Sequence, residues 1–130
     1  LGEIHQSVDA LQEGLKSAIH FIPNRGNFSR GIFATLYTKY NGTLEDAKSL
    51  FETYYKDAEF TIISENSIHL KQVVNTNKCL LQLEVHDGKL LITSVIDNLL
   101  KGASGQAVHN MNLMYGFEEH LGLQLKANYF

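Results

Sequence analysis

Residues 79–96 read CLLQLEVHDGKLLITSVI and contain the strongest hairpin signal in the chain. Asp87-Gly88 is a preferred two-residue turn, and strand-forming residues flank it on both sides. We therefore expect one strand over 79–86 and a second, antiparallel strand over 89–96. A two-residue turn also sets the register, which brings one apolar face of both strands together. The facing pairs on that face are Val85 with Leu90, and Leu83 with Ile92.

A third strand is expected over 31–39, where most residues are β-branched, aromatic or otherwise strand-forming. Apolar side chains fall on both of its faces, with Phe33 and Tyr37 on one face and Ile32 and Leu36 on the other. This pattern is typical of a strand that is covered on both sides. We therefore expect a second copy of the chain to cover the face that the helices leave open, and hence a homo-oligomer.

Three helices are indicated by apolar residues at helical spacing. The first opens the chain, and its apolar positions are Ile4, Val8, Leu11 and Leu15. The second begins at a capping-box pattern formed by Thr43 and Asp46. Its expected buried stripe is Leu44, Ala47, Phe51 and Tyr54. The third has the stripe Leu100, Ala103, Ala107, Met111 and Met114, and Gly116 ends it as a C-cap.

Shorter strands are expected over 18–22, which Pro23 stops, over 60–64, and over 69–74. The order of the elements predicts an α+β fold, in which a mixed, mostly antiparallel sheet carries helices on one face. A length of 130 residues suits one compact unit, so we expect a single domain over 1–130.

The composition argues against several functional classes. A formal net charge of −3 gives no electrostatic footprint for nucleic acid, and no apolar run is long enough to span a membrane. The single cysteine, Cys79, rules out an internal disulfide and is typical of the reducing cytoplasm. The six histidines have no metal-ligand spacing, so no metal site is expected.

Two features indicate a fragment of a larger protein. The chain begins at Leu1 and enters its first helix without a capping residue. No glycine-rich dinucleotide fingerprint follows a strand anywhere in the sequence. A truncated chain explains both features.

The first candidate site is the loop that precedes the strand over 31–39. It holds both arginines of the chain, Arg25 and Arg30, and guanidinium groups suit carboxylate and phosphate ligands. Gly31 lets the backbone approach a ligand closely, and Asn24 either orients a ligand or forms an Asx turn. The alternative is that both arginines are solvated loop residues.

The second candidate site is residues 97–106, DNLLKGASGQ, which join the hairpin to the third helix. Amide groups at a helix start favour anions, Lys101 adds a positive charge, and the small residues let a ring or a phosphate lie against the backbone. Tight helix packing is the alternative. Residues 75–79, NTNKC, are a third candidate because the thiolate of Cys79 is a nucleophile. No histidine is near Cys79 in sequence, so we favour a buried, inert thiol.

Three segments together resemble N-acetyl-γ-glutamyl-phosphate reductase, an enzyme family of arginine biosynthesis. Residues 21–32 (FIPNRGNFSRGI) are similar to its Phe-x-Pro…Arg-Gly-Ile segment, and 73–79 to its Thr-Asn-(Lys/Arg)-Cys strand. Residues 97–112 (DNLLKGASGQAVHNMN), followed by 114–116 (MYG), resemble its closing helix. A shorter Asp-Asn-Leu…Lys-Gly-Ala motif is shared with aspartate-semialdehyde dehydrogenase.

The resemblance covers essentially the whole chain and implies the C-terminal, substrate-binding and dimerisation domain of a glyceraldehyde-phosphate-dehydrogenase-like enzyme. The implied reaction is the reduction of N-acyl-γ-glutamyl phosphate. A thiolate attacks the acyl phosphate, phosphate leaves, NADPH delivers hydride to the thioester, and N-acyl-glutamate semialdehyde departs. The cysteine, the catalytic histidine and the NADP-binding Rossmann domain would all precede Leu1, so no catalytic residue is expected in this chain.

The resemblance also implies individual site residues. The substrate-binding residues are Asn24, Arg25, Arg30 and Gly31, although many members of the family have His where this chain has Asn24. The cofactor-binding residues are Asn98, Lys101 and Gly102. Two alternatives stay open: a fragment of an aspartate-semialdehyde dehydrogenase, and a stand-alone, non-catalytic module that binds a ligand or dimerises.

Overall fold

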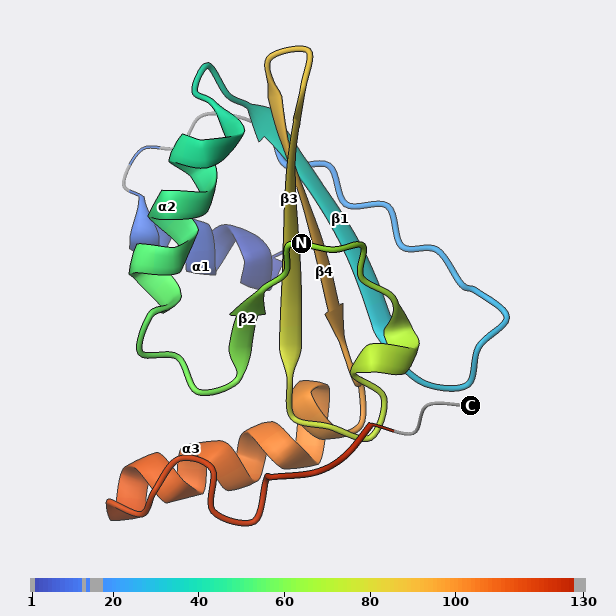
Figure 1. Ribbon diagram of the computed structural model, residues 1–130, viewed down its shortest axis with the longest axis vertical. Coiled ribbons are helices and arrows are strands. Elements are labelled where there is room, and N and C mark those ends of the chain that lie inside the picture. The colour runs from blue at the N-terminus through green and yellow to red at the C-terminus, as the bar shows by residue number, and fades with distance from the viewer. Residues whose placement is uncertain (1, 13, 15–17, 128–130) are drawn as a thin grey trace.

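The computed structural model describes residues 2–12, 14 and 18–127 (Figure 1). The elements in chain order are α1 (Gly2–Leu11), β1 (Ile32–Lys39), α2 (Leu44–Tyr55), β2 (Thr61–Ile63), η1 (Leu70–Gln72), β3 (Cys79–His86), β4 (Lys89–Ile96), η2 (Leu100–Ser104) and α3 (Gly105–Tyr115). Of the two short helices, η1 is a 3-10 helix and η2 is a π-helix. The expected first helix is confirmed as α1, while Leu15, assigned to its apolar face, lies outside the described residues.

The four strands form one sheet in the order β1-β4-β3-β2. The hairpin of β3 and β4 is confirmed with its register, since Val85 pairs with Leu90 and Leu83 with Ile92. Strand β1 adds to β4 antiparallel, and β2 adds to β3 parallel. The sheet is therefore mixed and mostly antiparallel, and with its helices it forms the α+β fold that the sequence predicts.

Helix α2 covers one face of the sheet over β2, β3 and part of β4, and the main core lies between them. It leaves Ile32 and Leu36 of β1 exposed on the same face. Its start is the predicted capping box, in which Thr43 and Asp46 each satisfy the other's backbone amide. Ala47 is fully buried against Leu83 and Leu90. The expected buried stripe is wrong at its last member, because Tyr54 is 73% exposed, whereas the neighbouring Tyr55 is half-buried.

The opposite face of the sheet is covered at one end by the segment around η1. Ile68 and Val73 pack there against Val95, in a second buried cluster. The strand expected over 69–74 is wrong, because this segment bends into a 3-10 turn. The side chain of Gln72 accepts a hydrogen bond from the backbone amide of His69 at 2.8 Å. This bond stabilises the turn and is incompatible with an extended strand.

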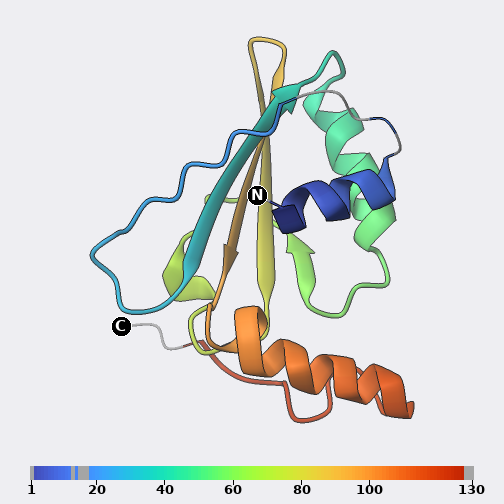
Figure 2. The ribbon, with the colours of Figure 1, turned by 180° about the vertical axis from the view of Figure 1, so that it is seen from behind.

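The strand expected over 18–22 is also wrong. This segment runs outside the sheet, and Phe21 and Ile22 are 57% and 78% exposed (Figures 1 and 2). A strand requires a hydrogen-bonded neighbour. Among the described residues β1 pairs only with β4, so 18–22 forms no ladder with the open edge of β1.

Helix α3 lies across the end of the sheet rather than on the face that α2 covers (Figure 1). It ends at Gly116, whose φ of 69° makes it the predicted left-handed C-cap. The expected stripe is wrong over most of its length, since Ala103 and Ala107 are exposed and Met111 and Met114 are 45% and 80% exposed. Asn112 is buried instead, because its amide donates hydrogen bonds to two carbonyls of the segment that follows the helix.

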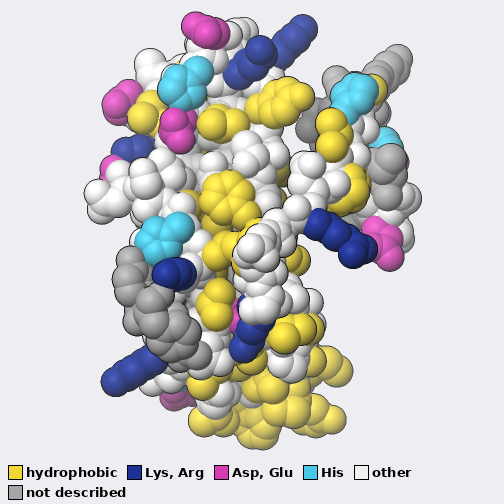
Figure 3. Space-filling view, turned by 90° about the vertical axis from the view of Figure 1, so that its right-hand side faces the viewer, with side chains coloured by type: hydrophobic (Ala, Val, Ile, Leu, Met, Phe, Trp, Pro, Cys, Tyr) yellow, Lys and Arg dark blue, Asp and Glu magenta, His cyan; other side chains and the backbone are white. Residues whose placement is uncertain are grey.

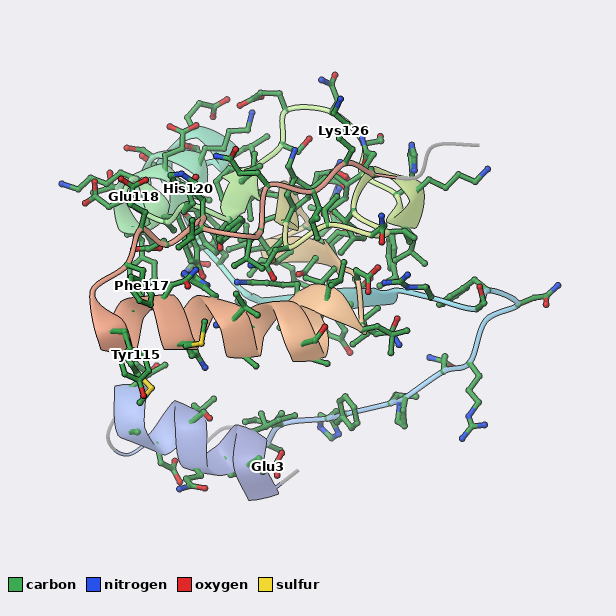
Figure 4. The ribbon with its side chains drawn as sticks, turned by 90° about the horizontal axis from the view of Figure 1, so that it is seen from below. Glu3, Tyr115, Phe117, Glu118, His120 and Lys126 are labelled. Carbon is green, nitrogen blue, oxygen red and sulfur yellow. The ribbon has the colours of Figure 1, made fainter. Side chains whose placement is uncertain are left out.

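That C-terminal segment returns along the end of the sheet. It turns at Phe117 and passes His120 before it reaches Lys126 (Figure 4). Leu123 is buried, with 4% of its surface exposed, and the carbonyl of Lys126 accepts a hydrogen bond from the side chain of Asn75 at 3.5 Å. The outer side of α3 stays apolar and uncovered, and Figure 3 shows hydrophobic side chains gathered at this end of the molecule.

Candidate functional site

The two segments that the sequence marks as candidate sites meet at one end of the β1–β4 pair. Ile32 pairs with Ile96 at the beginning of β1 and the end of β4. The residues just before β1 therefore lie beside those just after β4. Nη2 of Arg30 lies 2.7 Å from Oδ2 of Asp97, and the amide of Gly31 donates a hydrogen bond to Oδ1 of Asn98 at 2.6 Å.

Asp97 is the centre of this arrangement. Its side chain is fully buried, and its carboxylate accepts hydrogen bonds from three backbone amides, those of Asn75 at 2.6 Å, Leu99 at 2.7 Å and Leu100 at 3.0 Å. Burial by itself raises the pKa of Asp97, but these amides and Arg30 outweigh it, so the pKa is lowered from its ordinary value. The site therefore contains a charged, buried carboxylate.

Arg30 is only partly enclosed, with 30% of its side chain exposed. Its Nε is buried and has no hydrogen-bond partner within the described part of the chain. The next residue, Gly31, has a φ of +110°, and a Cβ at that position would lie 2.6 Å from Cδ2 of Leu70. Glycine is thus required here by its backbone conformation, and it lets η1 approach the site.

The other two predicted substrate residues are not brought to this cluster by any contact between described residues. Asn24 is exposed, and its side chain donates a weak hydrogen bond to the carbonyl of Ile22 at 3.3 Å, which is a local loop contact. Arg25 is exposed in the same loop. The structure therefore joins Arg30 and Gly31 to the site and leaves Asn24 and Arg25 on the loop outside it.

The predicted cofactor residues follow the site directly. Asn98 uses its carbonyl oxygen for Gly31, which leaves its amide nitrogen available as a donor. Gly102 is exposed, and its backbone amide donates to the carbonyl of Asp97 at 2.9 Å. Nζ of Lys101 lies 5.6 Å from the ring centroid of Phe60. Burial lowers the pKa of Lys101 from its ordinary value, although Cys79 and Glu119 oppose the shift.

Residues 100–104 form a π-helix, which no pattern in the sequence indicated. The amide of Ser104 reaches back five residues to the carbonyl of Leu99 at 3.1 Å. Single turns of π-helix occur often at functional sites. Behind this turn lies Asn77, which is 1% exposed and has no partner for either polar atom of its side chain in the described structure. Its Oδ1 lies where a Cβ on Gly105 would stand, so Gly105 is needed for this close approach.

Asp97 and Asn75 each begin a candidate segment of the sequence, but no role was predicted for either residue. One usable signal was present for Asp97: an aspartate that follows a buried strand and precedes a helical segment is a natural acceptor for free amides. Asn75 has a φ of 67°, and asparagine tolerates this left-handed conformation better than most residues. Its partner Asp97 is distant in sequence, so no local pattern revealed the contact.

Cys79 is half-buried in β3, with its Sγ 3.6 Å from Oγ of Ser94. No contact between described residues joins it to a histidine that could act as its base, although the charge of Lys101 is close enough to interact with it. Within the described ranges, no three side chains of His, Cys, Asp or Glu are arranged to hold a metal ion. No helix there combines the length and the apolar character that crossing a membrane requires.

Comparison with known proteins gives two findings. The sequence profile of the semialdehyde dehydrogenase dimerisation domain matches residues 1–98. N-acetyl-gamma-glutamyl-phosphate reductase of Christiangramia forsetii is 68% identical over 130 residues, which is 100% of this chain and 40% of that protein. The proteins of the same name from Parabacteroides distasonis and Bacteroides thetaiotaomicron are 58% and 59% identical, over 100% and 98% of this chain and 40% of each relative.

These relatives carry the name of the family that the three sequence segments resemble, so that resemblance is confirmed. The chain spans about two fifths of the length of the curated relatives it matches. The match to a dimerisation domain also agrees with the α+β architecture of the sheet and its helices.

Proposed function

The chain belongs to the family of semialdehyde dehydrogenase dimerisation domains, and from this premise we propose that it is the substrate-binding and dimerisation part of an NADP-dependent reductase. The substrate is an N-acyl-γ-glutamyl phosphate and the product is the N-acyl-glutamate semialdehyde. The observation that carries the proposal is the meeting of the Arg30–Gly31 loop with the Asp97–Gly102 segment. One segment supplies a cation for the substrate, and the other supplies polar groups for the cofactor.

Arg30 binds an anionic group of the substrate. The acyl phosphate substrate carries a phosphate and a carboxylate, and guanidinium groups bind both through charge-assisted hydrogen bonds. Arg30 is partly exposed and has donors left over from its contact with Asp97. We assign Gly31 to the same site because its backbone is held there. Arg25 and Asn24 belong to the rim of the site in this proposal, since they precede Arg30 in one exposed loop.

The groups after Asp97 fit the nicotinamide end of NADP. Asn98 offers an amide nitrogen for which no acceptor is found among the described residues, and the exposed Gly102 has no side chain that would keep a flat ring from the backbone. Lys101 belongs to the same segment, and its ammonium lies over the ring of Phe60. When bound, the nicotinamide supplies the hydride for the reduction. The role of this chain is to orient the cofactor against the substrate held at Arg30.

The nucleophile and the main nucleotide-binding domain belong, in this proposal, to the part of the enzyme that this chain does not span. The single domain over 1–130 then docks on a Rossmann domain of the same protein. The apolar outer side of α3, which exposes Met111, Met114 and Tyr115, is suited to that contact. We propose that the enzyme works in the cytoplasm, where the free thiol of Cys79 stays reduced.

A second copy of the chain packs on the face of the sheet that α2 does not cover. Phe33 and Tyr37 on β1 are 49% and 70% exposed on that face, and a shallow hollow beside them receives partner side chains. The residues lining the hollow are Tyr37, His86, Asp87, Lys89 and Leu91. An exposed apolar sheet face of this kind marks an interface.

The test is an assay of the full-length protein that contains this chain. We expect NADPH oxidation that depends on N-acetyl-γ-glutamyl phosphate, with little turnover of β-aspartyl phosphate, and a comparison with NADH and with the N-succinyl substrate defines both specificities. The isolated chain of residues 1–130 is expected to be inactive. Absence of turnover by the full-length protein, or turnover by the isolated chain, contradicts the proposal.

A further inference from the structure

We propose that Asp97 is a positioning residue, which holds one edge of the Arg30 guanidinium so that the rest of the group is presented to the anionic end of the substrate. This inference rests on the proposed function and deepens it. Asp97 does not itself touch the substrate, because its side chain is fully buried.

The contact between the two side chains is one-sided. Oδ1 of Asp97 is occupied by the amides of Leu99 and Leu100. Only Oδ2 reaches Arg30, at Nη2. A guanidinium carries five donors in a planar fork, and within the described structure only Nη2 has an acceptor. Asp97 thus fixes the position of Arg30 but uses only part of its hydrogen-bond donors. The remaining donors are free to bind the anionic group of the substrate.

The carboxylate of Asp97 is held in place by hydrogen bonds that do not involve Arg30. Three backbone amides hold its carboxylate, and one of them belongs to Asn75, whose backbone has a φ of 67°. A neighbouring bond from Gly31 to Asn98 ties the Arg30 loop to the same segment. A flexible arginine loses side-chain entropy when it binds a ligand, and prior positioning reduces that loss. Asp97 therefore strengthens substrate binding through Arg30.

The exposure of Arg30 agrees with this role. Its side chain is 30% exposed, yet Nε is buried and Nη2 faces a fully buried carboxylate. The accessible part of the side chain therefore lies away from Nε and from the carboxylate of Asp97. The guanidinium of Arg30 is therefore fixed by Asp97 on its buried side, while part of the side chain stays accessible to a ligand.

The test is a double-mutant cycle in the full-length protein with N-acetyl-γ-glutamyl phosphate as the substrate. The variants are Arg30→Gln, Asp97→Asn and the double variant, and Asp57→Asn is the matched control because that carboxylate is 87% exposed. We expect each single change to raise the KM for the acyl phosphate about tenfold, with a smaller effect on kcat and on the KM for NADPH. The double variant should match Arg30→Gln alone, because Asp97 acts only through Arg30. Asp57→Asn should behave like the wild type.

A merely structural role of Asp97 predicts a different result, in which the effects of Arg30→Gln and Asp97→Asn multiply to about a hundredfold. That outcome, or an unchanged KM in Asp97→Asn, overturns the proposal. If Asp97→Asn does not fold, the variant Arg30→Lys provides the test of the proposal instead. A lysine paired with Asp97 is a single point charge, without the planar set of donors that would let it bind Asp97 and the substrate at once. The KM of Arg30→Lys for the acyl phosphate should therefore also rise about tenfold. A wild-type KM in folded Arg30→Lys overturns the proposal.

The failure of the proposed function is distinguishable from the failure of this inference. Wild-type protein without turnover of the acyl phosphate refutes the function, and the role of Asp97 falls with it. Wild-type protein with normal turnover and a multiplicative cycle refutes the role of Asp97 alone.

Discussion

The backbone amide of Gly31 and the side-chain carbonyl of Asn98 form a hydrogen bond of 2.6 Å, although 67 residues separate them. This bond joins the loop before the first strand to the turn after the last one. Together with the ion pair of Arg30 and Asp97, it makes a single site out of two segments that are remote in sequence. Changes on either segment should therefore affect the same binding event.

Replacing Arg30 with Ala should weaken substrate binding far more than replacing Lys39 with Ala. A charge-assisted contact contributes roughly 1.5–3 kcal/mol, which corresponds to about ten- to a hundredfold in binding. Lys39 is exposed at the far end of the same strand, and its loss should change stability by less than about 0.5 kcal/mol. Steady-state kinetics of the full-length variants measure the difference. Thermal melts serve as the control, since Arg30→Ala also leaves the buried Asp97 without its cation. Equal kcat/KM in folded Arg30→Ala and wild type would contradict the prediction.

The ion pair also predicts how stability depends on pH. The folded-state pKa of Asp97 is lowered below its ordinary value of 3.8. The group therefore contributes stability above about pH 4 that is lost as the pH falls through the folded pKa. The Tm difference between wild type and Asp97→Asn should be full near neutral pH and should shrink below about pH 4. A difference that is constant over this range would show that the charge of Asp97 makes no contribution.

Gly31→Ala should destabilise the protein by roughly 1–2 kcal/mol. Its φ of +110° disfavours any Cβ, and that atom would also press on the end of the Leu70 side chain. Gly2→Ala is the matched control, because Gly2 lies in α1 and a Cβ added there would meet no atom within 4 Å. Chemical denaturation of both full-length variants gives the comparison. Equal stabilities would show that the backbone at position 31 relaxes without cost.

Dimer formation should depend on Tyr37 and not on Tyr54. Both tyrosines are highly exposed, at 70% and 73%, but Tyr37 lies on the uncovered sheet face and Tyr54 lies on α2. Tyr37→Glu buries a charge in the expected interface and should shift the protein toward monomer, while Tyr54→Glu should leave the assembly unchanged. Sedimentation velocity at micromolar concentration measures both. A Tyr37→Glu protein that assembles like the wild type would move the interface to another surface.

Cys79→Ser should retain reductase activity in the full-length protein. The thiol lies beside Ser94, and no described histidine contacts it, so it lacks the base that an active-site thiolate needs. We expect kcat within about threefold of the wild type, since this half-buried thiol acts as a small packing group. Loss of activity with an unchanged Tm would identify Cys79 as the nucleophile and would place the chemistry inside this chain.

Local patterns in the sequence were sufficient for the hairpin and for the start of α2. The turn at Asp87-Gly88 and the box of Thr43 and Asp46 involve residues only a few positions apart, so their chemistry sets their structure. The segment 18–22 has the composition of a strand, but a strand forms only where a partner is available, and that depends on the whole chain. The stripe of α3 failed for a similar reason, because the returning C-terminal segment takes Asn112 as its anchor.

The two segments of the candidate site could be selected from the sequence, but the contact between them could not. Arg30 was selected because arginine suits anionic ligands, and Gly31 because glycine lets a ligand approach the backbone. Each of these properties belongs to the residue itself and can be read at one position of the sequence. Asp97 acts by collecting donors from Arg30, Asn75 and the helix start. Its importance is a property of three segments that meet, which no single stretch of sequence displays.

The pairing of β1 with β4 has a consequence for how the protein folds. The hairpin of β3 and β4 closes a two-residue turn, but β1 must close a loop that reaches from Ile32 to Ile96. Loop closure over such a span is entropically costly, so this pairing is expected to form after the hairpin. Arg30 and Asp97 stand at the point where that closure is completed. A ligand that bridged both segments, as the proposed function requires, should therefore slow their separation. The contact that forms last in folding would then be the one that the ligand protects from opening.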